Sequence, residues 1–276
     1  MKLIACRTHP TCVDLQLTGK RALVSGSTAG IGFAIARKLA AEGASVIVNG
    51  RTEERVAEAA GKIRKEYPKS HLVNFAGDLS RADVAEKAFQ RFAMIDILVN
   101  NLGTFNTKTF EELTDADWQS IIETNFMSGV RLSRHWLSKM KTVGWGRVIF
   151  ISSESAVNIP VELIHYGVTK TMQVALARGL AETTAGTAVT VNSILPGPTR
   201  SEGVEAFLTE IARKKRTSAA EVEKEFFATM RPSSLLKRFA TPDEVAALVA
   251  FIASPLSSAT NGAALRVEGG LLRSIL

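Results

Sequence analysis

The segment RALVSGSTAGIG, residues 21–32, decides the fold of this chain of 276 residues. Its first five residues are typical of a short buried strand, and the strand runs directly into glycines at positions 26, 30 and 32. Apolar residues then recur at helical spacing as far as Gly43, and a second apolar strand follows at 45–49. A strand, a helix and a strand in this order form a βαβ unit, whose two strands lie parallel.

The same alternation of strand and helix continues along the chain. Thr114 and Asp117 form the pattern of a helix N-cap with its reciprocal acid, and the helix is expected to run on through Asn125. The pattern predicts one doubly wound α/β domain, a Rossmann fold with a parallel sheet and helices on both faces. We expect this domain over residues 17–276, after an N-terminal extension of residues 1–16. Other helices are expected at 53–66 and from about 81, and strands at 72–76, 95–100, 148–152, 188–195 and 264–267.

One segment, at about 199–238, interrupts this alternation. It follows a strand end, carries many charges, including a basic run at 213–216, and contains helical pieces. We expect it to form a lid over the substrate pocket. The apolar residues of this segment either line the pocket or form the lid's own core. These residues are Phe207, Leu208, Phe226, Phe227 and Met230.

Composition and charge exclude several classes of protein. The chain is 46% hydrophobic, and no apolar run approaches the ~20 residues of a membrane helix or forms a signal-peptide core. We therefore expect a cytoplasmic protein without a membrane segment. Cys6 and Cys12 are too few for a disulfide framework or a zinc set, so no metal site is expected. The net charge of +7 indicates an anionic ligand or partner, such as a phosphorylated cofactor. Because no nucleic-acid-binding motif accompanies the charge, no nucleic-acid partner is expected.

The glycines of the first strand–helix turn predict a phosphate site. Phosphate groups need backbone N–H donors brought close, and the N-terminus of a helix supplies these donors with a favourable dipole. Glycine removes the side chains that would block the approach. The spacing GxxxGxG differs from the commoner GxGxxG, but its place between a strand and a helix favours dinucleotide binding.

The end of the second strand indicates which dinucleotide is bound. A carboxylate there would hydrogen-bond the ribose diol of NAD, whereas an arginine accommodates the 2′-phosphate of NADP. The chain reads Asn49-Gly50-Arg51, with no carboxylate. NADP(H) is therefore favoured over NAD(H), although an Arg51 that points into water would leave the preference open.

Tyr166 and Lys170 are candidates for proton transfer. Four residues apart in a predicted helix, their side chains share one face. The reference pKa of tyrosine is about 10, and a nearby cation lowers it by stabilising the phenolate. The pair could therefore exchange protons near neutral pH.

In their order along the chain, these motifs resemble those of the short-chain dehydrogenase/reductase family, and of its 3-oxoacyl-acyl-carrier-protein reductases in particular. The resemblance covers the chain from about Leu17 to Gly270. Residues 25–32 resemble the family's TGxxxGxG, and residues 100–103 resemble its NNAG, with Leu102 in place of Ala. Residues 196–199 and 267–270 resemble its PG motif and its C-terminal signature.

The resemblance implies an oxidoreductase that transfers hydride between a nicotinamide cofactor and a carbonyl or alcohol substrate. Tyr166 would donate the proton, and Ser153 would hydrogen-bond the developing oxyanion. Lys170 would hold the nicotinamide ribose and lower the pKa of Tyr166, while Asn125 would anchor a water that relays protons to Lys170. The cofactor contacts that it implies are Ser25, Gly26, Ser27, Thr28, Gly30, Ile31, Gly32, Arg51, Asp78, Leu79, Asn101, Gly103, Tyr166, Lys170, Pro196, Gly197 and Thr199.

Three residues near this site have alternative roles. Ser152 competes with Ser153, because adjacent residues of a strand point to opposite sides, and the family spacing of thirteen residues before Tyr166 favours Ser153. Glu154 either enters the substrate pocket or faces solvent. His165 is expected to be a packed or surface histidine.

Partners follow from the helix that carries Tyr166. Val168, Met172, Ala175 and Leu176 make it apolar on the side away from Tyr166 as well, so a second subunit is expected to cover it, in a homodimer or homotetramer. The substrate is expected to be a small carbonyl or alcohol, among 3-oxoacyl thioesters, sugars, steroids and simple ketones. The alternative is a non-catalytic dinucleotide-binding regulator or scaffold of the same fold, which the full catalytic set disfavours.

Overall fold

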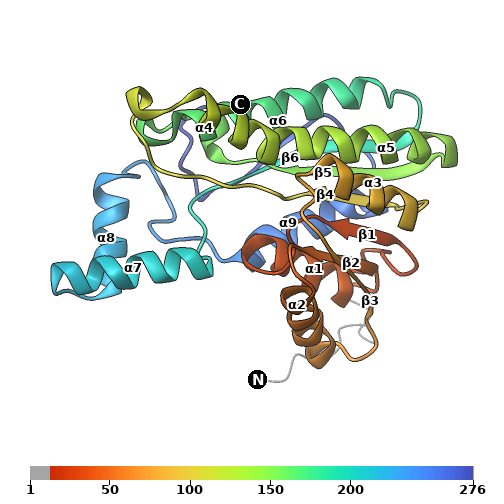
Figure 1. Ribbon diagram of the computed structural model, residues 1–276, viewed down its shortest axis with the longest axis horizontal. Coiled ribbons are helices and arrows are strands. Elements are labelled where there is room, and N and C mark those ends of the chain that lie inside the picture. The colour runs from red at the N-terminus through yellow and green to blue at the C-terminus, as the bar shows by residue number, and fades with distance from the viewer. Residues whose placement is uncertain (1–12, 276) are drawn as a thin grey trace.

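The fold is a seven-stranded parallel sheet in the order β3-β2-β1-β4-β5-β6-β7 (Figure 1). The computed structural model describes residues 13–275, apart from the side chain of Phe207. Cys6, Cys12 and most of the predicted extension lie outside the described residues. The sheet confirms the predicted doubly wound Rossmann fold. The strands are β1 (Arg21–Val24), β2 (Ser45–Gly50), β3 (His71–Ala76), β4 (Ile97–Asn100), β5 (Trp145–Ile151), β6 (Ala188–Pro196) and β7 (Ala264–Val267).

Helices cover both faces of this sheet. On one face α1, α2 and α9 pack around residues such as Leu39 and Val249, and on the other α3, α5 and α6 pack around Trp136 and Ala177 (Figure 1). The two layers bury both faces, as a parallel sheet requires. The helices are α1 (Gly30–Ala41), α2 (Glu53–Glu66), α3 (Ala82–Arg91), α4 (Asp115–Ile122), α5 (Ser128–Val143), α6 (Ile164–Glu182), α7 (Glu202–Lys215), α8 (Ala219–Thr229) and α9 (Pro242–Ala253).

The strands supply both cores by simple alternation. On β5, Val148 and Phe150 face the layer of α3, α5 and α6, while Ile149 and Ile151 face the layer of α1 and α9. Each of these side chains is at most 3% exposed. A strand with apolar residues on both sides reads as a continuous apolar run, which is what the sequence shows at this position.

The order of the strands places a crevice between β1 and β4. From β1 the chain winds outward through β2 to β3, then returns to β4 on the other side of β1 and winds outward again to β7. Ligands of doubly wound sheets bind at such a reversal, outside the carboxyl ends of the strands. The glycine loop after β1 and the Asn-Asn-Leu-Gly motif after β4 both begin at this edge.

The predicted lid contains α7 and α8, which stand away from the sheet (Figure 1). Leu208, Phe227 and Phe239 are buried together in a small core of their own, and Phe226 packs against it. Of the two roles expected for the apolar residues of this segment, these residues therefore form the lid's own core. Met230 differs, because it is 48% exposed.

Three predicted elements differ in detail. Strand β5 ends at Ile151, before Ser152, and β4 begins at Ile97, two residues later than expected. The long helix predicted through Asn125 is interrupted, because Glu123–Met127 form a π-helical turn between α4 and α5. The capping box of Thr114 and Asp117 at the start of α4 is confirmed.

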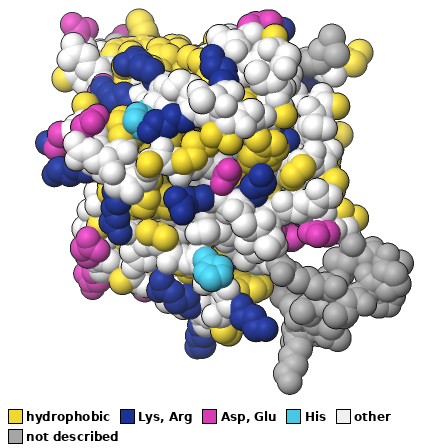
Figure 2. Space-filling model, turned by 90° about the vertical axis from the view of Figure 1, so that its right-hand side faces the viewer, with side chains coloured by type: hydrophobic (Ala, Val, Ile, Leu, Met, Phe, Trp, Pro, Cys, Tyr) yellow, Lys and Arg dark blue, Asp and Glu magenta, His cyan; other side chains and the backbone are white. Residues whose placement is uncertain are grey.

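Basic residues are spread over the surface. On the face shown in Figure 2, Lys and Arg side chains are scattered among acidic and apolar ones. At the end of α7, Lys214 pairs with Glu210 and Lys215 with Glu225, at 2.6 and 2.7 Å. The basic run therefore lies partly neutralised on a solvated helix, and the expectation of no nucleic-acid partner stays a prediction. No helix in residues 13–275 is long and apolar enough to cross a membrane.

Candidate active site

The glycine loop between β1 and α1 forms one wall of the crevice. Gly26 and Gly30 have φ angles of +64° and +55°, in the left-handed region that favours glycine. A Cβ on Gly32 would come within 3.0 Å of the carbonyl oxygen of Gly26. Within the described chain no side chain caps α1 at Ala29, and its first turn carries no acid. Its first N–H groups can therefore receive an anionic ligand.

The motif after β4 fixes this loop in place. The Nδ2 of Asn101 donates to the carbonyls of Ser25 and Gly26, at 2.9 and 3.1 Å. The Ser25 hydroxyl accepts from the N–H groups of Asn101 and Leu102, at 2.9 and 3.1 Å. Leu102, which stands where the family has Ala, packs on the loop, since a Cβ on Gly26 would lie 3.1 Å from its Cδ2.

Asn49 is a second brace that sequence reasoning missed. It is 1% exposed at the end of β2, and its Oδ1 accepts from the N–H of Gly26 at 3.0 Å. Its Nδ2 donates to the carbonyls of Phe75 and Gly77, at 3.1 and 3.0 Å. The side chain thus joins the glycine loop to the end of β3. In the sequence this position indicated only a lack of charge, and the available signal was a polar amide at the end of an apolar strand.

The predicted adenine side of the site lies beyond β2 and β3. Arg51 follows β2 and is exposed. The carboxylate of Asp78 accepts from the N–H and hydroxyl of Ser80, at 3.0 and 2.7 Å. Leu79 is fully buried in the core of the sheet, so its side chain cannot contact a ligand. Leu79 was predicted to contact the cofactor, and only its main-chain atoms are available for that contact.

Ser153, Tyr166 and Lys170 meet at the carboxyl edge between β5 and α6. The Ser153 hydroxyl hydrogen-bonds the phenol of Tyr166, and the Nζ of Lys170 lies 5.5 Å from the centroid of the phenol ring. Lys170 is 4% exposed, and its Nζ donates to the carbonyl of Ile151 at 2.8 Å. Gly103 adjoins this cluster, because a Cβ there would lie 3.3 Å from the Nζ. The end of β4 thus meets the Tyr-Lys face of α6.

The two neighbouring serines point in different directions. The Oγ of Ser152 donates to the main-chain carbonyl of Lys170 at 2.8 Å, so it is engaged with the backbone of α6. Ser153 has extended backbone, with φ of −166°, and its hydroxyl lies on the side of the phenol. This geometry supports Ser153 for the role beside Tyr166.

Burial shifts the pKa values of the Tyr-Lys pair. It raises the pKa of Tyr166 to about 12, with a smaller rise from the charge of Glu154 and an opposing effect from the hydrogen bond of Ser153. Burial also lowers the pKa of Lys170 to about 7. The prediction of a lowered pKa for the phenol is therefore wrong for the chain by itself, because desolvation of the phenol is the largest effect on it.

Asn125 lies in the π-helical turn and is 1% exposed. Its Oδ1 accepts from the N–H of Thr104 at 2.8 Å, and its Nδ2 donates to the Thr104 carbonyl at 2.9 Å and to the Thr169 hydroxyl at 3.1 Å. Thr169 in turn donates to the carbonyl of Tyr166 at 2.8 Å. The side chain of Asn125 thus connects the segment after β4 to the helix that carries Tyr166. π-helical turns are frequent at functional sites.

The Pro-Gly motif after β6 packs against the C-terminal signature. A Cβ on Gly197 would lie 2.7 Å from the carbonyl oxygen of Glu268, so only glycine fits this approach. The Thr199 hydroxyl donates to the Gly197 carbonyl at 2.9 Å, and Pro196 ends β6. The carboxylate of Glu268 accepts from the N–H of Leu272 at 3.2 Å. The last strand therefore supports the segment that faces the crevice.

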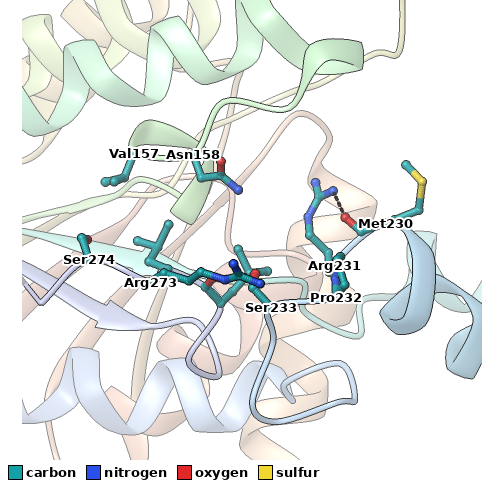
Figure 3. A pocket seen from close by; sticks show the side chains of 10 residues that line it. Val157, Asn158, Met230, Arg231, Pro232, Ser233, Arg273 and Ser274 are labelled. Atoms are coloured by element: carbon teal, nitrogen blue, oxygen red, sulfur yellow. Dashed lines mark hydrogen bonds between the residues drawn. The ribbon is translucent and has the colours of Figure 1, made fainter.

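A cavity of about 450 Å³ lies between the segment after α8 and the C-terminal segment. Arg231, just after α8, and Arg273, in the C-terminal segment, enter it from two elements (Figure 3). The Nε of Arg231 lies 3.5 Å from the Oε1 of Glu154, the residue after Ser153. Glu154 is 4% exposed, so the alternative that it faces solvent is wrong. The cavity is lined by Val157, Asn158, Met230, Arg231, Pro232, Ser233, Leu271, Leu272, Arg273 and Ser274.

His165 is a packed histidine, as expected. It is fully buried, and its Nε2 lies 2.7 Å from the Oδ1 of Asn106, in hydrogen-bond contact. Its ring also meets Trp118 edge to face, at 6.1 Å between centroids.

Comparison with known proteins places this geometry in a family. Residues 26–272 match the family model described as Enoyl-(Acyl carrier protein) reductase. The chain belongs to the short-chain dehydrogenase/reductase family. This dehydrogenase/reductase is 46% identical over 263 residues to the uncharacterized oxidoreductase YvaG of Bacillus subtilis, with 95% of this chain and 100% of YvaG covered. It is 32% identical over 262 residues to the 3-oxoacyl-[acyl-carrier-protein] reductase FabG of Aquifex aeolicus, with 94% and 100% covered.

A solved structure agrees closely with the fold. The L-sorbose reductase of Gluconobacter frateurii, complexed with NADPH and L-sorbose, superposes with a TM-score of 0.89 at 30% identity, with 95% of this chain and 100% of that chain covered. The predicted family resemblance is confirmed, and this short-chain dehydrogenase/reductase is an NAD(P)-dependent oxidoreductase. None of these comparisons supports the alternative of a non-catalytic regulator.

Proposed function

We propose that this enzyme transfers hydride between NADP(H) and a small carbonyl or alcohol substrate. The observation that carries the proposal is the cluster of buried Ser153, half-buried Tyr166 and buried Lys170 at the same sheet edge as the glycine loop. A phenol bonded to a hydroxyl and close to an ammonium can donate a proton to a carbonyl oxygen. The NADPH and L-sorbose of the Gluconobacter reductase support the same class of reaction here.

The residues of the crevice fit a dinucleotide. The glycine loop leaves the first N–H groups of α1 open, which suits a pyrophosphate. Arg51 is exposed beyond β2, and residues 49–51 include no carboxylate that would repel a 2′-phosphate. Arg51 is therefore the proposed contact for the 2′-phosphate of NADP(H). Two of the three N–H donors of Lys170 have protein acceptors, and the third can bind a ribose hydroxyl.

The proton chemistry favours the reducing direction. The bound nicotinamide supplies the hydride. Because the pKa of Tyr166 is about 12, the phenol holds its proton at neutral pH, and this is the form that a carbonyl reduction needs. Ser153 donates a hydrogen bond to the same oxygen as negative charge develops on it. Lys170, whose pKa is about 7, exchanges protons readily at working pH and can help to restore the phenol.

The substrate side of the site is proposed to include the cavity next to Glu154. Phe105 meets the ring of Tyr166 edge to face, at 5.9 Å between centroids, and is 65% exposed. An apolar part of the substrate can pack on Phe105, while polar groups can face Arg231.

A cytoplasmic location and a small-molecule substrate are also part of the proposed function.

Oligomerisation is proposed from the outer side of α6. Val168 and Met172 are partly exposed, and Ala175 and Gly179 are exposed, so this apolar stripe is open to a second subunit. Sedimentation as a monomer at micromolar concentration would argue against a homodimer or homotetramer.

The first test is titration of the protein with NADPH and with NADH, followed by nicotinamide absorbance over a panel of ketones, sugars and 3-oxoacyl thioesters. Tight NADPH binding with substrate-dependent decay of absorbance is expected. Preference for NADH would contradict the role of Arg51, and binding without turnover on any substrate would favour the regulator.

The second test is Tyr166→Phe. It should abolish turnover because the proton donor is lost, while NADPH affinity changes little. Tyr67→Phe is the matched control, since Tyr67 is the chain's other tyrosine and packs at the end of α2. Wild-type rates in Tyr166→Phe would refute the assignment.

A further inference from the structure

Gln173 occupies the position between Lys170 and Asn125. It lies one turn after Lys170 on α6 and is 2% exposed. Its Nε2 donates to the main-chain carbonyl of Asn125, and its Oε1 accepts from the Nζ of Lys170 at 3.3 Å. The neighbours of Gln173 determine the orientation of its side-chain amide. In the flipped orientation its NH₂ group would face the ammonium of Lys170, and its oxygen would face the carbonyl oxygen of Asn125.

We propose that Gln173 is a positioning residue, which ties the ammonium of Lys170 to the main-chain carbonyl of Asn125 in the place where a relay water was expected. The inference rests on the proposed function of Lys170. A side-chain amide satisfies the same two partners as a bridging water would, one as donor and one as acceptor. Asn125 therefore acts on Lys170 through a fixed side chain.

The local structure explains why this carbonyl can be reached. Asn125 lies in the π-helical turn of Glu123–Met127, where the regular hydrogen-bond ladder of α4 and α5 is interrupted. Side chains can insert at such interruptions. The side-chain amide of Asn125 is already held by Thr104 and Thr169, so its main-chain carbonyl is fixed in position. Gln173 then meets a rigid acceptor.

The charge of Lys170 gives the bridge its importance. The ammonium is buried, and its acceptors among the described residues are two neutral oxygens, the carbonyl of Ile151 and the Oε1 of Gln173. Loss of either oxygen would leave a buried cation with one partner fewer. The amide oxygen thus favours the charged form of Lys170 and fixes the position of its Nζ.

The bridge also changes how protons leave the site. A water can accept one proton while it donates another, whereas an amide N–H bound to a carbonyl does not exchange its proton on the time scale of turnover. Gln173 consequently closes the route from Lys170 toward Asn125. Protons that pass through Lys170 must then leave on another side of the Nζ, such as the side of the exposed Gly103, where a Cβ would lie 3.3 Å from it.

The decisive experiment compares Gln173→Leu with Gln173→Ala in steady-state kinetics. Leu nearly fills the volume of Gln, removes both hydrogen bonds and excludes water, so kcat should fall about tenfold or more with little change in KM. Ala opens space in which a water can bridge Lys170 and Asn125, so it should keep more of kcat than Leu. Gln90→Leu, on the exposed side of α3, is the control and should keep wild-type kcat.

A role in packing alone predicts the opposite order, because Ala leaves a cavity and Leu does not. A kcat in Gln173→Leu equal to or above that of Gln173→Ala would therefore overturn the proposal.

A second readout does not depend on turnover. The pKa of Lys170, measured from the pH dependence of its Cε signal in ¹³C NMR, should fall by about 1–2 units in Gln173→Leu, since an acceptor for the ammonium is lost. An unchanged pKa would overturn the positioning role. If the pKa falls but the wild-type enzyme reduces no carbonyl, the bridge stands and the proposed function fails.

Discussion

Gly32→Ala tests the packing of the glycine loop most directly. A Cβ at this position would lie within 3.0 Å of two atoms, the carbonyl oxygen of Gly26 and the Nδ2 of Asn101. The first atom belongs to the backbone and cannot turn away. The second donates to the carbonyls of Ser25 and Gly26, so moving it breaks hydrogen bonds that hold the loop. The substitution must therefore displace either the loop or its brace.

The magnitude follows from these contacts. Overpacking of this kind costs about 1–3 kcal/mol, and each hydrogen bond of Asn101 that is lost costs about 0.5–1.5 kcal/mol. Inside a helix, alanine stabilises the folded state by about 1 kcal/mol relative to glycine, which offsets part of this loss of stability. The free energy of unfolding should fall by about 1–5 kcal/mol, and the Tm should fall by roughly 2 °C or more. NADPH affinity should fall as well, because the N–H groups of the loop move.

The assay is thermal unfolding without cofactor, followed by NADPH titration. The matched control is Gly61→Ala in the middle of α2, where a Cβ would meet no atom within 4 Å. That variant should gain about 0.5–1 kcal/mol from helix propensity alone and keep its cofactor affinity. If Gly32→Ala raised the Tm as Gly61→Ala does, the close approach described for the loop would be refuted.

Three further predictions concern the site. Ser153→Ala should lower kcat by about 10²-fold or more through loss of the oxyanion donor, whereas Ser152→Ala should change it only a few-fold, and equal losses in steady-state kinetics would contradict the distinction between the serines. Lys170→Met should raise stability most at or below pH 7, because the unfolded chain keeps this proton up to its ordinary pKa of 10.5 while the folded chain loses it near 7. This advantage should shrink as the pH rises toward 10, and a constant difference in Tm between pH 6 and pH 10 would refute the lowered pKa of Lys170. Arg51→Glu should reduce affinity for NADPH far more than for NADH, and equal losses in fluorescence titration would remove Arg51 from the 2′-phosphate site.

Much of the fold was predictable from local patterns. The glycines after β1 and the alternation of apolar strands and helices predicted a parallel doubly wound sheet, and the structure confirms it. The capping box of Thr114 and Asp117 was also predictable, because its two residues lie three positions apart in the sequence. Such signals depend on neighbours in the sequence, and neighbours in the sequence are always close in space.

The site was predictable only in part. The spacing of Tyr166 and Lys170 and the motif order singled out residues that the structure brings together. The pKa of Tyr166 was predicted in the wrong direction, because the sequence shows the nearby lysine but does not show how strongly the folded chain desolvates the phenol. Asn49 and Gln173 were missed, since their partners lie in other elements of the chain.

The sequence by itself therefore determined the family, the parallel sheet, the phosphate-binding turn and the candidate proton donor. Only the tertiary structure decided that Ser153 rather than Ser152 lies beside the phenol, that Phe227 belongs to the separate core of α7 and α8, and that Gln173 stands between Lys170 and Asn125. The physical reason is that periodicity and spacing are properties of adjacent residues. Desolvation and hydrogen bonding between distant segments arise only when the chain has folded and water has been excluded.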